Sequence, residues 1–144
     1  MRYFYMEPEV SGRLGDGTIM DRSVHPPIIS ELHYEMEGWL GDAILESFPA
    51  FIVTEQARQG LISAAITGAS FAEVHVTTSE TFRELYPARE IPPFAWLKPV
   101  GKAAHDDFGT ASDGRLVVSE RALQVLRKFG TENALVEPFV DHAI

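Results

Sequence analysis

The sequence predicts a single α+β domain with a mixed or antiparallel sheet that contains two internally repeated β-α-β units. Residues 51–57 and 116–122 match position by position in their apolar, hydroxyl, glutamate and alanine residues, and a leucine lies four residues beyond each. A glycine and a second apolar stretch follow both segments, so the units span about 50–76 and 115–140. A chain of 144 residues has the usual length of one domain, so 1–144 is expected to fold as one.

The composition restricts the chemistry that the chain can perform. Hydrophobic residues make up 45% and charged residues 23%, which is typical of a soluble globular protein. The absence of cysteine excludes disulfides, thiolate metal sites and a cysteine nucleophile. No apolar run approaches the roughly 18–20 residues that cross a bilayer, and the N-terminus turns acidic too early for a signal peptide. We therefore expect a cytoplasmic location.

The charge restricts the partners. Twelve basic residues against 21 acidic ones give a net charge of −9. The N-terminal part, residues 1–48, is the more acidic, with nine Asp or Glu against three Arg. Because phosphate repels carboxylate, this balance argues against binding to nucleic acid or an anionic membrane and favours a basic protein partner.

The acidic N-terminal part is expected to contain two strands. Residues 2–6 form a short aromatic strand, and the glycines and prolines of 11–27 predict a long loop. Residues 28–39 alternate with period two, which predicts a half-buried strand with an acidic outer row. Residues 40–48 are punctuated by glycine and followed by proline, so a short helix or an irregular connection is expected there.

The first unit is predicted to begin with a strand at 50–53. Thr54 is expected to cap a helix that ends at Gly68, before a return strand at 71–76. Between the units, Ser79 caps a short helix that Pro87 ends, and the proline-led segment 91–98 predicts an edge strand.

The second unit follows a predicted loop at 102–114. A strand at 115–118 leads to Ser119, which is expected to cap an amphipathic helix that Gly130 ends. Residues 134–140 predict the last strand. The apolar stripe of the helix contains Ala122, Val125, Leu126 and Phe129.

The acidic outer row of 28–39 is the candidate contact surface for a basic partner. A metal site would need convergent ligands that the sequence does not mark, whereas a contact surface needs only exposure; a plain solvent-exposed face is the alternative. The candidate partner-binding residues are Glu31, His33, Glu35, Glu37, Trp39 and Asp42.

Two alternatives of other classes remain open. His105, Asp106 and Asp107 could serve a small hydrolase or a metal-dependent enzyme, although adjacent residues seldom converge on one ion. A self-associating scaffold, such as a homodimer, would place the aromatic strand 2–6 at its interface. The chain contains no nucleophile motif and no phosphate-binding loop, so no catalytic residue, metal or cofactor is predicted.

The pattern of residues 115–122, with Leu126, Gly130 and Phe139, resembles a segment of the immunity proteins of bacterial polymorphic toxin systems and related uncharacterised bacterial proteins. The likeness is strongest over residues 115–139 and concerns a valine–serine–glutamate junction between a strand and an amphipathic helix. Because this motif is structural, the resemblance assigns no active-site residue to this sequence. The resemblance implies an inhibitor of a cognate toxin that is not itself an enzyme. A nuclease is one candidate toxin, since an acidic protein can occupy a surface meant for phosphate.

Overall fold

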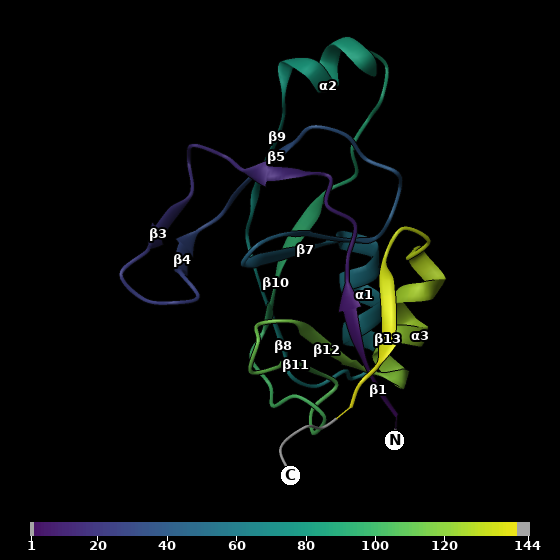
Figure 1. The fold of residues 1–144 in the computed structure, drawn as a ribbon. Coiled ribbons are helices and arrows are strands. Elements are labelled where there is room, and N and C mark those ends of the chain that lie inside the picture. Colours follow the sequence, from purple (N-terminus) through teal and green to yellow (C-terminus); the bar gives the residue numbers. More distant parts are fainter. Residues whose placement is uncertain (1, 141–144) are drawn as a thin grey trace.

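The computed structural model describes residues 2–140, which form an α+β fold made mostly of sheets with three helices (Figure 1). The helices are α1 (Glu55–Ser63), α2 (Glu80–Leu85) and α3 (Glu120–Phe129). Sheet A contains, in spatial order, β11 (Phe108–Thr110), β12 (Leu116–Ser119), β1 (Tyr3–Glu7) and β13 (Leu135–Pro138). Sheet B contains β6 (Ile44–Ser47), β7 (Ala50–Thr54), β10 (Phe94–Pro99) and β8 (Ala69–Ala72).

Two smaller sheets complete the fold. Sheet C contains β2 (Gly12–Leu14), β5 (His33–Met36) and β9 (His75–Thr78). Among residues 2–140, β3 (Ile19–Asp21) and β4 (Ile28–Glu31) pair only with each other, and we call this ribbon, with its connecting loop, the arm. The arm projects away from the helices (Figure 1).

All three predicted helix N-caps are confirmed. The side-chain oxygens of Thr54, Ser79 and Ser119 accept hydrogen bonds from the backbone N–H three residues later, at 3.2, 3.0 and 3.0 Å. Each bond satisfies a donor that the first helical turn leaves free. The predicted end of the first helix is wrong, because α1 stops at Ser63, and Ala65 then takes a positive φ of 53°.

The two strands of each predicted unit do not lie side by side. β7 and β8 both pair with β10, whereas β12 and β13 both pair with β1, and all four pairings are antiparallel. The prediction of an edge strand at 91–98 is therefore wrong, since β10 is an interior strand. β1 is likewise paired on both sides, so the self-association alternative could not use a free edge of this strand.

Several short strands were absent from the sequence-based prediction. The expected loop at 11–27 contains β2 and β3, and the expected loop at 102–114 contains β11. The predicted strand at 28–39 is divided at Leu32 into β4 and β5, which belong to different sheets, and β6 occupies the predicted helix or irregular connection at 40–48. These strands have three or four residues, and pairing with neighbouring strands stabilises them more than their own propensity does.

Sheet B separates two apolar clusters. Phe51, Val53 and Leu97 pack with α1 and α3 on one side. Ile52 and Trp96 pack on the other side with side chains of β5 and α2. Both faces of β7 and β10 are therefore buried, which explains their nearly continuous apolar sequences.

The helices α1 and α3 lie against each other beside the sheets (Figure 1). Their contact explains a glycine within α1, where this residue normally weakens a helix. A Cβ at Gly60 would lie 2.6 Å from the ring of Phe129, so the glycine makes room for that ring.

Candidate functional site

The alternation predicted along 28–39 is confirmed, but an arginine partly neutralises the acidic row. Leu32, Tyr34 and Met36 are buried, and Glu31 and Glu37 are exposed. Nε of Arg13 lies 2.8 Å from a carboxylate oxygen of Glu35 and 3.4 Å from one of Glu37. One cation thus serves two carboxylates, and this surface keeps a negative charge.

His33 holds the base of the arm in place. Its Nδ1 accepts a hydrogen bond of 3.0 Å from the backbone N–H of Gly17, so the other ring nitrogen, Nε2, carries the proton and donates to Oγ1 of Thr77 at 2.7 Å. Its backbone N–H and C=O both bond the hydroxyl of Thr18. The geometry gives His33 a structural role, and its contact with a partner stays a prediction.

Trp39 is half-buried and contacts Asp42 and Arg89. Its indole Nε1 donates to the carbonyl oxygen of Asp42 at 3.0 Å, and the guanidinium of Arg89 lies 4.9 Å above its ring. This cation–π contact covers part of the ring that a partner would otherwise reach.

Asp42 is a correction to the predicted surface, because it is completely buried. Its carboxylate accepts two hydrogen bonds of 2.9 Å from Asn133, one from the backbone N–H and one from the side-chain amide. Burial raises the pKa of Asp42, although these two bonds oppose the shift. Asp42 ties the segment before β6 to the loop after α3.

Glu46 of β6 gives a pH-dependent prediction. Burial, with a smaller contribution from the charge of Glu7, raises the pKa of Glu46 to about 6. Because the folded chain holds this proton more tightly than the unfolded chain, stability falls as the pH rises from about 4.5 to about 6. Glu46→Gln should therefore stabilise the protein by about 1 kcal/mol at pH 7.5, after allowance for the partial exposure of the group. Thermal melts should show this gain disappear near pH 4; a gain of equal size at pH 4 and 7.5 would contradict the prediction.

The two aspartates of the enzyme alternative are engaged in structural contacts. Asp107 is 5% exposed, and its carboxylate accepts hydrogen bonds from Ser119 Oγ at 2.6 Å, from the Thr67 N–H at 2.8 Å and from Arg121 Nη2 at 2.6 Å. The carboxylate of Asp106 accepts from the backbone N–H of Lys102 at 2.7 Å. Within residues 2–140, no group of three or more His, Asp or Glu side chains is arranged to hold a metal ion.

A groove lies between the arm and sheet B. Two adjoining cavities, of about 440 and 760 Å³, share Trp96 and Lys98 of β10. We call them the apolar cavity and the polar cavity, and together the arm groove. Their volumes lie within the range of roughly 300–1,000 Å³ that binding sites occupy.

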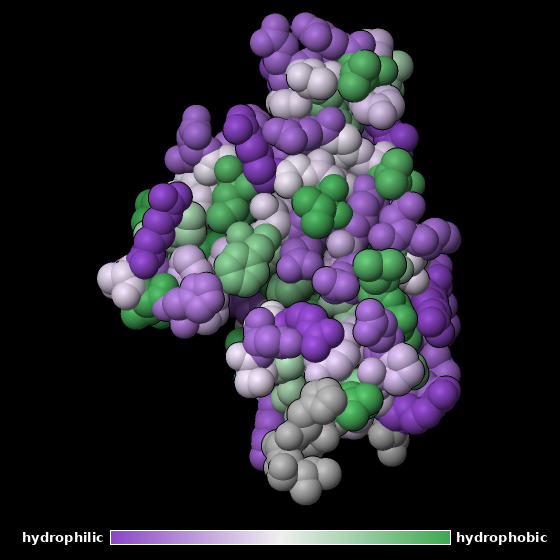
Figure 2. All heavy atoms as spheres, in the orientation of Figure 1, coloured by the Kyte–Doolittle hydropathy of each residue, from purple (hydrophilic) through white to green (hydrophobic). Residues whose placement is uncertain are grey.

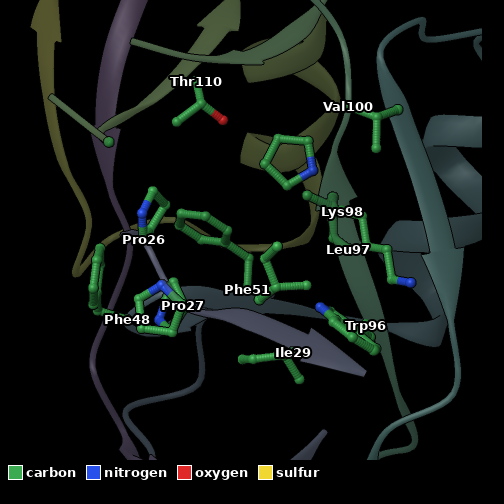
Figure 3. Close-up of a pocket in the computed structure, with 14 residues that line it drawn as sticks. Pro26, Pro27, Ile29, Phe48, Phe51, Trp96, Leu97, Lys98, Val100 and Thr110 are labelled. Atoms are coloured by element: carbon green, nitrogen blue, oxygen red, sulfur yellow. The ribbon is translucent and has the colours of Figure 1, made fainter. Parts of the chain in front are cut away.

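The apolar cavity lies beside the start of β4. Side chains from three separate segments point toward one another across it, among them Pro27 and Ile29 of the arm, Phe48 and Phe51 around the β6–β7 turn, and Trp96 (Figure 3). Figure 2 shows apolar side chains on the molecular surface, and Ile19, Val24, Ile28 and Phe48 are exposed apolar residues of the arm and the adjoining turn. A site of this composition suits an apolar side chain of a partner.

The sequence-based prediction missed this groove. The run His25-Pro26-Pro27-Ile28-Ile29 was assigned partly to a loop, although two prolines before two isoleucines are an unusual concentration of apolar surface in a turn. That run was the feature of the sequence that could have indicated the groove. The opposite wall, β10, could not be inferred because it lies some 65 residues away in the chain.

Comparison with models of known protein families gives no match, and comparison with curated proteins gives none either. Within the described residues, no helix has both the length and the apolar character to cross a membrane. The site itself is therefore the basis for a functional assignment.

Proposed function

We propose that the chain is a cytoplasmic binding protein, not an enzyme, that neutralises a cognate bacterial toxin by docking an acidic surface on it. The observation that carries the proposal is the surplus of negative charge around Arg13. Asp16, Glu35 and Glu37 form this acidic surface, and Arg13 pairs with the two glutamates. Glu31, the other exposed glutamate of the predicted row, lies on the wall of the polar cavity. Such a surface accelerates association with a basic partner, and the rate should fall as salt is added. The toxin as partner rests on the resemblance of residues 115–139, and a nuclease is one candidate.

The test is co-expression. We expect the reading frame upstream of the gene to encode a secreted protein with a toxic C-terminal domain, and co-expression of our chain should restore growth. The chain and the domain should also purify as a complex. A complex that fails to form, with growth still arrested, would show that the proposed function is wrong.

Charge reversal locates the contact. Glu35→Lys/Glu37→Lys should weaken the complex about tenfold or more, because attraction becomes repulsion at the surface. Arg13→Gln should have the opposite effect, since it removes the neutralising cation. Glu80→Lys/Glu84→Lys places the same charge change on α2 and serves as the control. Calorimetric affinities that are equal for the two double variants would exclude the acidic surface as the contact.

We also propose that each β-α-β unit arose by duplication of one segment together with the interior strand that precedes it in the chain, β1 before the first unit and β10 before the second. These two preceding strands have exchanged places, since β1 pairs with the strands of the second unit and β10 with those of the first. The pairing register supports this proposal. In sheet A, Tyr3 of β1 lies opposite Ser119, and in sheet B, Phe94 of β10 lies opposite Thr54. Ser119 and Thr54 are the N-caps of α3 and α1.

The sequences of the two interior strands support the same proposal. Residues 3–8 and 94–99 share the order aromatic, variable, aromatic, aliphatic, charged, proline. The carbonyl oxygen of the residue just before each interior strand accepts a 2.9 Å hydrogen bond from the first backbone N–H of a helix: Arg2 from α3 and Pro93 from α1. With its preceding interior strand included, each unit therefore contributes one strand to the sheet of the other.

A further inference from the structure

The polar cavity lies where two strands diverge. β5 and β9 run parallel, and the N–H of His75 donates to the carbonyl oxygen of Leu32 at 3.0 Å. Before this bond in the chain, the two segments separate: β4 pairs with β3, and β8 pairs with β10. Among the described residues, β4 and β8 each have one edge without a strand partner.

The two unpaired edges border the same space. β3 pairs with β4, and β2 pairs with β5, along the same edge of the continuous β4–β5 segment. The opposite edge of β5 pairs with β9, so the unpaired edge of β4 faces β9 and β8. The cavity of about 760 Å³ is lined by residues 30–32 on one wall and residues 72–75 on the other. Phe94, Trp96 and Lys98 of β10 also line it. The space is thus a wedge between two strand edges that remain available for hydrogen bonding.

The charges of the wedge favour a basic occupant. Glu31 and Glu73 are exposed, one on each wall, and neither forms an ion pair with another side chain in the part of the chain that the structure describes. The ammonium group of Lys98 lies 4.1 Å above the ring of Trp96, where the polar cavity meets the apolar one. A partner side chain that enters between Glu31 and Glu73 would be attracted if it carried a positive charge.

We propose that the wedge binds an extended segment of a partner protein as an added strand between β4 and β8. Backbone hydrogen bonds to the two edges supply affinity that does not depend on sequence. Glu31 and Glu73 select a basic side chain, and the adjoining apolar cavity selects an apolar one. This inference rests on the proposed function in that the partner is a basic protein, and it specifies the segment that such a partner presents.

The probe for the test is a library of short random peptides displayed on phage. The wild-type chain should select peptides in which lysine or arginine accompanies large apolar residues. Glu31→Gln/Glu73→Gln should weaken binding of a selected peptide about tenfold in fluorescence anisotropy. The control, Glu80→Gln/Glu84→Gln, should bind that peptide like the wild type. Glu31→Lys/Glu73→Lys, checked for folding by its thermal melt, should select acidic peptides instead.

Hydrogen exchange identifies the binding mode. The bound peptide should slow amide exchange in residues 28–32 and 69–74, the two edges of the wedge, and leave α2 unchanged. Selected peptides without basic residues, equal binding by the two Gln double variants, or protection elsewhere would each overturn the proposal. A dimer that Glu31→Gln/Glu73→Gln dissociates would also overturn it, because the occupant would then be a second copy. The acidic surface around Arg13 is not altered in these variants, so the co-expression test of the proposed function stands apart from this one.

Discussion

A chain that lacks residues 2–8 is expected not to fold cooperatively, even though the deletion removes only the first strand. β1 is bonded to β12 on one side and to β13 on the other, so its loss leaves both strands without the partner that joins them. Tyr5 and Met6 would also leave the interior, where they are 8% and 1% exposed. Each such side chain contributes about 1.5–3 kcal/mol, and the unpaired backbone groups of β12 and β13 add a similar cost. The total approaches the roughly 5–15 kcal/mol that stabilises a whole domain.

Circular dichroism during thermal unfolding measures the effect. The truncated chain should show no cooperative transition, whereas deletion of residues 22–27, a similar length from the tip of the arm, should preserve one. A cooperative melt of the truncated chain close to that of the full chain would mean that β1 is dispensable, and it would contradict the role of β1 in joining β12 to β13.

The second large effect is expected at Asp107. Asp107→Ala should destabilise the protein by about 3 kcal/mol, since removal of one member of a buried ion pair leaves its partners unsatisfied. Ser119 would lose the acceptor of its hydroxyl, and Arg121 would lose its carboxylate while keeping its bonds to the carbonyl oxygens of Ala64 and Ala65. The side chain of Arg121 is 44% exposed, so water compensates it in part, and this places the estimate at the lower end of the usual range.

Urea unfolding compares the stability losses of Asp107→Ala and Asp106→Ala, and so tests whether the network around Asp107 stabilises the fold more than a surface carboxylate does. Asp106→Ala should lower the free energy of unfolding by about 1 kcal/mol or less, because the Asp106 carboxylate has one backbone donor at an exposed turn. Comparable losses for the two variants would contradict the assignment of Asp107 as the anchor of this network.

Acid denaturation gives an independent measurement on the same carboxylate. Burial by itself raises the pKa of Asp107, but hydrogen bonds from Arg121, Ser119 and Thr67 outweigh it and lower the pKa to about 2. The folded state therefore holds the ionised form, and the stabilisation is present above about pH 4 and is lost between about pH 4 and 2. Asp107→Asn should lack this part of the acid transition.

Some features of the candidate site could be predicted from the sequence and others could not. The period-two pattern of 28–39 correctly predicted which side chains face the interior, because alternation follows from strand geometry alone. The assignment of Asp42 to the surface was wrong, since its burial depends on Asn133, which is 91 residues away. His33 could not be recognised as a structural residue for the same reason, because Thr77 and Gly17 meet it only after sheet C has formed.

The sequence by itself determined the mixed α+β class, the three helix starts and the negative charge of the protein, because a cap bonds within one helical turn and charge follows from composition. Only the tertiary structure decided which strands pair, and so placed β10 between β7 and β8, β1 between β12 and β13, and the arm beside sheet B. Strand pairing joins residues far apart in the chain through backbone groups that every residue carries, so the sequence hardly marks it.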